Sequence, residues 1–364
     1  MKQKPFIRSI IFLSVFFILG TAGAADALQA ISKTPYLGAI VIDAATGDVI
    51  SEDQADAKGY PASMIKLMNL IVILDAIKAG QIGLQDPVTI SAAVSHIGGS
   101  QVYLKENEVF PVEELIYAMM VQSANDAALA LAIHCAGSPE AFVEMMNKKA
   151  AEIGMKDTVY YSVHGLPPGK DQQPDMTTAR DMAKLCRELL KHPETLKYTS
   201  TQMREFRPDA PEPFIMRTHN HLLQHFEGCD GFKTGYYGAA GFSIAATAQK
   251  NGARAIAVVL GSTGRKLRDE KASILLSKGL MEILKKHPAP PPAAKAATAT
   301  DAAAATAAPV KAAAAEPAAK KSEPVTISRR TFYIVLGLNV LVIALLIAGL
   351  LVKRKKNNRP LMRI

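Results

Sequence analysis

The chain has 364 residues, of which 49% are hydrophobic and 21% charged, and its formal net charge is +9 at pH 7. This apolar content excludes a wholly disordered chain. Much of the positive charge lies at the two ends of the chain and in a segment rich in Ala and Pro, so we expect no nucleic-acid partner.

The N-terminal residues have the pattern of a secretory signal peptide. Lys2, Lys4 and Arg8 precede an apolar run of about a dozen residues, which ends at the small residues Ala22-Gly23-Ala24. We therefore predict a bacterial export signal over residues 1–24 that is cleaved after Ala24. An uncleaved anchor is the alternative, although the run is short for a membrane span.

The periodicity of apolar residues predicts a sheet built from distant segments. Two short β-prone runs, 39–42 and 48–51, predict a hairpin around Gly47. Helical patterns follow over residues 62–79, 112–135, 139–153, 177–192 and 267–286, and two further strands are predicted at 240–249 and 254–261. We expect an α/β fold of the α+β kind, in which one sheet packs beside a helical middle, within a domain over residues 30–286.

The C-terminal part predicts a tether followed by a membrane anchor. Residues 287–328 are mostly Ala, Pro, Lys and Thr, which have too little apolar surface to form a core. Residues 331–352 contain no charge and are long enough to cross a hydrocarbon layer of about 30 Å. The basic tail at 353–364 predicts a cytoplasmic C-terminus. We therefore expect a single-pass protein of the cell membrane with its domain on the periplasmic, extracytoplasmic side.

The cysteines and histidines do not predict a metal site. The three cysteines, Cys135, Cys186 and Cys229, are far apart, so at most one disulfide is possible, and small buried side chains are the default interpretation. His221 and His225 have helical ligand spacing, but no carboxylate lies between them as in zinc proteases, and we interpret them with His219 as structural or solvated. We expect no metal and no cofactor.

Three short motifs in a fixed order predict nucleophilic chemistry. Ser63 and Lys66 form S-x-x-K at the start of a predicted helix, although a serine there also fits an ordinary helix cap. Ser123 and Asn125 form S-x-N in the helical middle, and Lys233-Thr234-Gly235 follows near the last strands. Each motif alone is weak, whereas the ordered set is the signature of penicillin-recognising serine acyltransferases.

The motif residues suit an acyl-transfer site. Lys66 lies on the same helix face as Ser63 and can act as a base if burial and the nearby charge of Lys233 lower its pKa. Ser123 is then a candidate proton relay to a leaving amine, and Asn125 a candidate contact to a substrate peptide group.

The K-T-G segment suits substrate binding. Lys233 and Thr234 offer a charge and a hydroxyl for a terminal carboxylate, and Gly235 would let a substrate strand lie close to the sheet edge. The backbone N–H groups of Ser63 and Tyr236 are candidates for an oxyanion hole.

The chain resembles the D-alanyl-D-alanine carboxypeptidases of peptidase family S11, which are low-molecular-mass penicillin-binding proteins. The likeness runs from about residue 35 to residue 286 and includes GSQVYLKENEVFPVEELIYAMMVQSANDAA, FVEMMNKKAAEIGMKDTVYYSVHGL and GCDGFKTGYYGAAGFSIAATA. It implies a β-lactamase/transpeptidase-like fold with a five-stranded antiparallel sheet and an all-helical subdomain carrying Ser123. It also implies that Arg268 helps to bind the substrate carboxylate, with Arg265 as a competitor.

The chain departs from the family pattern in three places. Ala124 stands where the family usually has Gly, which should not harm Asn125. The second, β-rich domain common in the family is absent, and the Ala/Pro-rich tether occupies its place. A membrane-spanning helix replaces the usual amphipathic anchor.

The resemblance implies a serine-type carboxypeptidase that removes the terminal D-Ala from peptidoglycan stem pentapeptides. The expected partners are peptidoglycan stem peptides, β-lactam antibiotics as covalent inhibitors, and the membrane. A DD-endopeptidase that cleaves cross-links would use the same chemistry. A β-lactamase is disfavoured because no glutamate lies between Glu152 and Glu188 to direct a deacylating water, and a non-catalytic wall-binding protein is disfavoured because every motif residue is present.

Overall fold

The computed structural model describes residues 28–287, which lie within one compact unit of the chain. The predicted signal peptide (1–24), membrane helix (331–352) and basic tail (353–364) lie outside the described residues, as does the tether apart from His287. Within residues 28–287, no helix is both long enough and apolar enough to cross a membrane.

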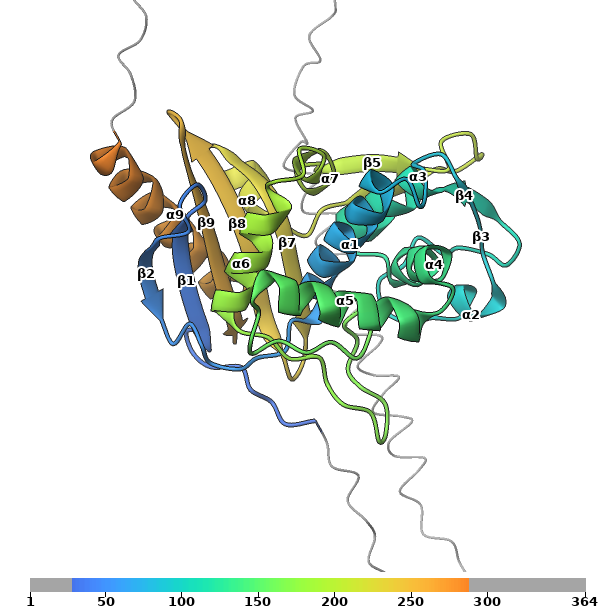
Figure 1. The fold of residues 1–364 in the computed structure, drawn as a ribbon, viewed down its shortest axis with the longest axis horizontal. Coiled ribbons are helices and arrows are strands. Elements are labelled where there is room, and N and C mark those ends of the chain that lie inside the picture. Colours follow the sequence, from blue (N-terminus) through green and yellow to red (C-terminus); the bar gives the residue numbers. More distant parts are fainter. Residues whose placement is uncertain (1–27, 288–364) are drawn as a thin grey trace, which may run out of the picture. The chain divides into compact units, whose positions relative to one another are not determined.

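A five-stranded antiparallel sheet forms one side of the described part (Figure 1). Its order is β2-β1-β9-β8-β7, with β1 at Gly38–Asp43, β2 at Val49–Asp53, β7 at Cys229–Tyr237, β8 at Gly241–Lys250 and β9 at Ala253–Ser262. β1 pairs with β9, so strands from opposite ends of the described chain lie side by side. The predicted single sheet and its two predicted hairpins are thus confirmed.

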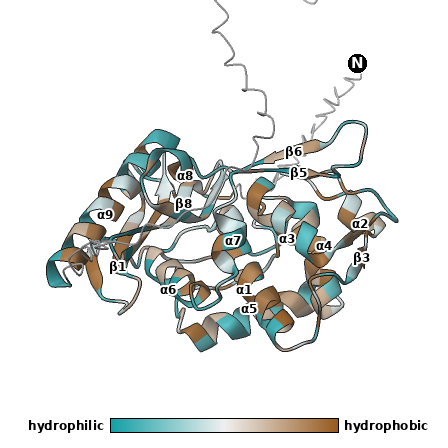
Figure 2. Cartoon of the chain, turned by 90° about the horizontal axis from the view of Figure 1, so that it is seen from above, coloured by the Kyte–Doolittle hydropathy of each residue, from teal (hydrophilic) through white to brown (hydrophobic). Residues whose placement is uncertain are grey.

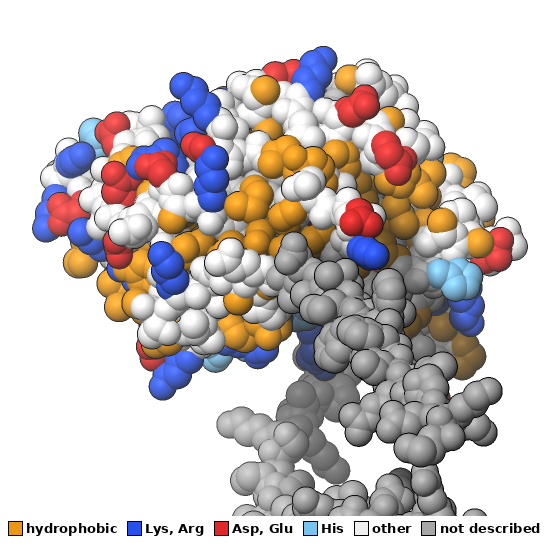
Figure 3. Space-filling view, turned by 90° about the horizontal axis from the view of Figure 1, so that it is seen from below, with side chains coloured by type: hydrophobic (Ala, Val, Ile, Leu, Met, Phe, Trp, Pro, Cys, Tyr) orange, Lys and Arg blue, Asp and Glu red, His pale blue; other side chains and the backbone are white. Residues whose placement is uncertain are grey.

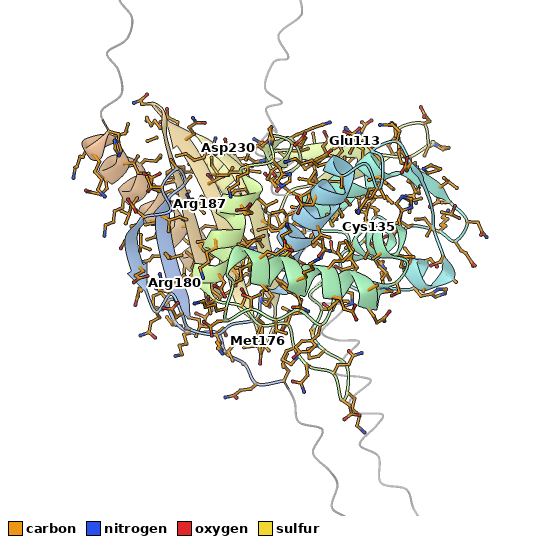
Figure 4. All side chains as sticks on the ribbon, viewed as in Figure 1. Glu113, Cys135, Met176, Arg180, Arg187 and Asp230 are labelled. Atoms are coloured by element: carbon orange, nitrogen blue, oxygen red, sulfur yellow. The ribbon has the colours of Figure 1, made fainter. Side chains whose placement is uncertain are left out.

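Helices cover both faces of the sheet because its central strands are apolar on both faces. Ile40 and Val258 belong to a large core that includes α6 (Ala179–Leu189), whereas Val41 and Val259 belong to a second core under α9 (Arg265–Lys286). Successive side chains of a strand point to opposite faces, which produces this division. Two arginines of α6 also bind the β1–β2 region: Arg180 pairs with Glu52 and Asp56, and Arg187 donates to the carbonyl oxygens of residues 44 and 45 (Figure 4).

A mainly helical region lies beside the sheet (Figures 1 and 2). A 3-10 helix (Ala62–Ile65) leads into α1 (Lys66–Lys78), which is buried on nearly every side, as expected of a core helix. The remaining helices are α2 (Ala92–Ser95), α3 (Val112–Tyr117), α4 (Asn125–Ala136), α5 (Pro139–Ile153), α7 (Thr195–Thr199) and α8 (Leu222–His225).

Two short hairpins accompany these helices, so the region is not purely helical. They are β3 (Pro87–Thr89) with β4 (Val109–Pro111), and β5 (Met203–Phe206) with β6 (Phe214–Arg217).

On the face shown in Figure 3, basic side chains are interspersed with acidic ones, and hydrophobic side chains gather near its middle.

The predicted helix over residues 112–135 is wrong as one continuous element. α3 passes into a π-helical turn (Ala118–Gln122), the chain then breaks at Ser123, and α4 begins at Asn125. Ser123 has a φ of 63°, a left-handed conformation that an α-helix does not contain. π-Helical turns are frequent at functional sites, and this one directs Ser123 away from the helical register.

We expect Leu276→Ala to lower the free energy of unfolding by about 2–5 kcal/mol, because Leu276 is fully buried between α9 and the sheet. The matched control is Met281→Ala on the same helix, where the side chain is 56% exposed. This control should change stability by no more than about 0.5 kcal/mol. Urea unfolding followed by circular dichroism measures both, and equal losses would contradict the assignment of the α9 core.

Candidate active site

Ser63 and Lys66 lie within hydrogen-bond distance at the start of α1. The Lys66 amine is 3.2 Å from the Ser63 hydroxyl, and it donates to Asn125 Oδ1 at 2.7 Å and to the carbonyl oxygen of His164 at 2.9 Å. Lys66 is fully buried. One helical turn separates nucleophile and amine, and segments 59 and 98 residues away in the sequence supply the other two contacts.

The surroundings of Lys66 favour its uncharged form. Burial lowers the pKa of Lys66 well below its ordinary value, and the positive charge of Lys233 lowers it further. The negative charges of Asp126 and Asp175 act in the opposite direction and are the smaller effects. A lysine whose pKa is lowered loses its proton more readily and can then act as a base, as the sequence analysis required of Lys66.

Ser123 points a free hydroxyl at the same site. Its Oγ is buried and has no hydrogen-bond partner among the described residues, and the residue lines the same cavity as Ser63. A buried hydroxyl without a partner is unfavourable, so its retention fits a group that meets a substrate.

Asn125 holds Lys66 in place. Its Oδ1 accepts from the lysine amine at 2.7 Å, and its Nδ2 donates to the carbonyl oxygen of Gly98 at 2.8 Å. Asn125 also lines the cavity. The sequence analysis expected Asn125 to contact only a substrate peptide group. It did not predict that the side-chain oxygen of Asn125 would orient Lys66.

The K-T-G segment lies in β7, an edge strand of the sheet, and passes directly beside the Ser63 turn. A Cβ on Gly235 would lie 2.4 Å from the carbonyl oxygen of Pro61 and 3.2 Å from the backbone nitrogen of Met64. Glycine is therefore required at 235 because the strand and the start of the helix lie in contact there. The sequence analysis had instead explained this glycine by the close approach of a substrate strand. Tyr236 is 56% exposed at the cavity and stacks on Phe242.

Three basic side chains lie near the site, and two of them, Arg265 and Arg268, line its cavity. Lys233 is buried, and burial together with the charge of Arg268 lowers the pKa of Lys233 to about 7. Arg268 is also buried and is paired with Asp269 at 2.7 Å, whereas Arg265 is exposed. Both arginines and Thr234 line the cavity, so both remain in reach of a ligand anion. An arriving carboxylate would raise the pKa of Lys233 and favour its charged form.

A cavity of about 520 Å³ joins most of these groups, although the buried Lys66 and Lys233 are not among its lining residues. Its wall includes Ser63, Ser123, Asn125, Thr234, Gly235, Tyr236, Arg265 and Arg268, together with Leu166, Pro167, His219 and His221. The volume is in the range of small-ligand sites. Burial and the charge of Lys233 lower the pKa of His219 to about 4, so its ring is neutral at pH 7.

The sequence analysis missed two contributions to this cavity. It treated His219 and His221 as structural or solvated, although both line the wall, and it assigned His164 no part in the site. The structure shows that the backbone carbonyl of His164 contacts Lys66. The order of the motifs gave no signal for these residues, because side-chain patterns do not reveal backbone contacts.

The cysteines form no disulfide, and the described residues form no metal site. The three cysteines are free, and Cys186 is buried in the core as predicted for a small apolar side chain. In residues 28–287 no group of three or more His, Cys, Asp or Glu side chains is arranged to hold a metal ion.

Comparison with known proteins agrees with the geometry. Residues 28–264 match the family model of peptidase S11, D-alanyl-D-alanine carboxypeptidase. The chain belongs to the D-alanyl-D-alanine carboxypeptidase family, S11. It is 36% identical over 238 residues to the D-alanyl-D-alanine carboxypeptidase DacF of Bacillus subtilis, a match that covers 65% of this chain and 60% of DacF. The chain thus spans less than two thirds of that relative.

Solved structures of penicillin-binding proteins have the same fold. Penicillin-binding protein 6B of Escherichia coli is similar with a TM-score of 0.62 at 31% identity, over 71% of this chain and 80% of that one. Penicillin-binding protein D2 of Listeria monocytogenes, in its ampicillin-bound form, has a TM-score of 0.60 at 27% identity, over 67% and 97% of the two chains. The predicted fold class is confirmed.

We expect Gly235→Ala to destabilise the protein by about 1–3 kcal/mol, because the new methyl group meets the Pro61 carbonyl oxygen and backbone cannot move aside cheaply. Gly238→Ala is the matched control at the end of the same strand region, where a Cβ meets nothing within 4 Å. Its effect should stay within about 0.5 kcal/mol. Urea unfolding compares the two variants, and an unaffected Gly235→Ala protein would contradict the close contact.

Proposed function

We propose that this protein is a serine-type D-Ala-D-Ala carboxypeptidase that removes the terminal D-Ala from peptidoglycan stem pentapeptides through an acyl-enzyme on Ser63. Membership of the S11 family supports this proposal. The single observation that carries it is the buried Lys66 amine, 3.2 Å from the Ser63 hydroxyl and with a strongly lowered pKa.

The contacts of Lys66 suit a general base. A neutral amine has two N–H bonds and one lone pair, and Asn125 Oδ1 and the His164 carbonyl oxygen accept the two N–H bonds. The lone pair is left for the remaining neighbour, so the Ser63 hydroxyl donates its proton to Lys66. The Ser63 oxygen then attacks the carbonyl carbon of the penultimate D-Ala.

The next step expels the terminal residue. The C–O bond to Ser63 forms and the C–N bond to the terminal D-Ala breaks, while the backbone N–H groups of Ser63 and Tyr236 stabilise the oxyanion. Such a donor is typically worth about 3 kcal/mol. Ser123 relays the proton from Lys66 to the leaving amine, a role that its unpaired hydroxyl supports. Water then hydrolyses the ester and returns the proton to Ser63.

The positive wall of the cavity suits the carboxylate of the terminal D-Ala. Thr234 and Arg268 line the cavity and offer a hydroxyl and a positive charge. Lys233, the buried residue before Thr234, adds a basic group whose charged form an arriving carboxylate would favour. The edge position of β7 suits a peptide that lies alongside it, and Asn125 borders the same space.

The same Ser63 chemistry makes β-lactams covalent inhibitors. Ampicillin is bound in the Listeria relative. Hydrolysis of the drug should be slow, because Asp171 is exposed and Asp175 is already occupied by hydrogen bonds, so neither resembles the glutamate of a β-lactamase.

The sequence at the two ends supports a location outside the cytoplasm. In this proposal residues 1–24 export the chain, residues 30–286 form the catalytic domain, residues 287–328 tether it, and residues 331–352 anchor it in the cell membrane with a cytoplasmic tail at 353–364.

We expect benzylpenicillin to add once to the protein and to remain on Ser63, as read by intact-mass spectrometry and peptide mapping. Ser63→Ala should give no adduct, and Ser277→Ala, an exposed serine of α9, should react as the unchanged protein does. Release of D-Ala from a defined muropeptide pentapeptide should be lost in Ser63→Ala and kept in Ser277→Ala.

Other outcomes of this experiment would contradict the proposal. Rapid turnover of penicillin would indicate a β-lactamase, and absence of any adduct would indicate a wall-binding protein without catalysis. Cleavage of cross-linked dimers in preference to pentapeptides would indicate a DD-endopeptidase.

A further inference from the structure

We propose that Asp175 is a positioning residue for Lys66: together with Ser162 it fixes the turn that holds the His164 carbonyl oxygen against the lysine amine. The inference rests on the proposed function, in which Lys66 is the base for Ser63. Asp175 lies outside the three motifs and does not itself touch Ser63 or Lys66 through a hydrogen bond.

The turn over residues 161–166 is attached to α1 by two consecutive carbonyl groups. Val163 O accepts from Asn69 Nδ2 at 2.7 Å, and His164 O accepts from Lys66 Nζ at 2.9 Å. Asn69 and Lys66 are three residues apart and share one face of the helix. The position of the turn therefore sets one of the two N–H directions of the neutral lysine, and with it the direction of the lone pair.

Asp175 holds this turn by three hydrogen bonds from two adjacent residues. Its Oδ1 accepts from the backbone N–H of Tyr161 at 2.6 Å and of Ser162 at 2.9 Å, and its Oδ2 accepts from the Ser162 hydroxyl at 2.7 Å. The Ser162 oxygen in turn accepts from the N–H of Gly165 at 2.9 Å. A continuous chain of contacts thus leads from the carboxylate to the residues on both sides of His164.

The turn has little room to adjust. Gly165 has a φ of 72°, and a Cβ there would lie 2.1 Å from the carbonyl oxygen of Ala62, the residue before Ser63. The base of the loop is closed by paired backbone hydrogen bonds between Val159 and Met176, the latter labelled in Figure 4. Thr177 pairs in the same way with Gly59, just before the Ser63 turn. Asp175 therefore lies where the loop returns to the segment that carries the nucleophile.

The charge of Asp175 does not explain its presence. Lys66 faces the positive charge of Lys233 on β7, the carboxylates of Asp126 on α4 and of Asp175, and the neutral imidazole of His164 on the loop. The negative charge of Asp175 favours protonated Lys66 and so opposes a neutral base. The hydrogen bonds of the carboxylate are the contribution that helps the reaction. An asparagine keeps the two bonds that Oδ1 accepts, and its amide can donate to the Ser162 oxygen in place of the third.

The test compares Asp175→Ala with Asp175→Asn by single-turnover acylation with benzylpenicillin across a pH range. Asp175→Ala should slow acylation on the high-pH plateau by about 10- to 100-fold, because a small misplacement of the base is costly. Asp175→Asn should keep most of the plateau rate and should move the acidic limb of the profile to lower pH, since one negative charge near Lys66 is gone. Ser162→Ala should fall between them.

Asp181→Ala is the matched control. Asp181 is another buried carboxylate that accepts from a backbone N–H, that of Asp157 at 2.8 Å, and from the Thr158 hydroxyl at 3.0 Å, but it accepts no hydrogen bond from the turn at 161–166. It should lose thermal stability and keep the plateau rate of the folded protein.

Two results would overturn the inference. One is a folded Asp175→Ala protein whose acylation rate equals that of the unchanged protein or that of Asp175→Asn. The other is an equal loss of rate in Asp181→Ala, which would indicate general destabilisation. Failure of the unchanged protein to form any adduct would instead overturn the proposed function.

Discussion

The hydrogen bonding of one buried amine governs this site. Lys66 is buried, its charge is disfavoured by burial and by Lys233, and its two N–H bonds have acceptors in Asn125 and in the His164 carbonyl. The same contacts would also accommodate a protonated lysine, which has a third N–H for Ser63. Lys66 can therefore take up and return a proton without rearrangement of its neighbours, as a residue that acts first as base and then as acid requires.

The fold brings these neighbours together through close backbone contacts. β7 approaches the Ser63 turn closely enough that only glycine fits at 235, and the turn at 161–166 approaches the same segment closely enough that only glycine fits at 165. β7 belongs to the C-terminal part of the described sheet, whereas Ser123 lies at the chain break before α4 and Asn125 begins α4, both in the middle of the described chain. Sheet and helical region thus meet at Ser63, and the cavity lies where they meet.

The sequence predicted the parts of the site that depend on side-chain type and spacing. Ser63, Lys66, Ser123 and Lys233 were identified because their motifs have a fixed order, and the strands and long helices follow from apolar periodicity. The break at Ser123 was missed because the apolar pattern of residues 112–135 continues across it. The hairpins β3–β4 and β5–β6 were too short to show a period. The contact of the His164 carbonyl could not be predicted, because every residue has a backbone carbonyl and the sequence does not distinguish this one.

The central claim is that Lys66 is uncharged near neutral pH, and its most direct test is an NMR titration of lysines labelled at the ε-carbon, with Lys66→Arg to assign the signal. The account predicts that Lys66 titrates well below the ordinary lysine value of 10.5, and that Lys233→Gln raises its midpoint because a neighbouring positive charge is removed. A Lys66 signal that titrates near 10.5 in the folded protein would contradict the account.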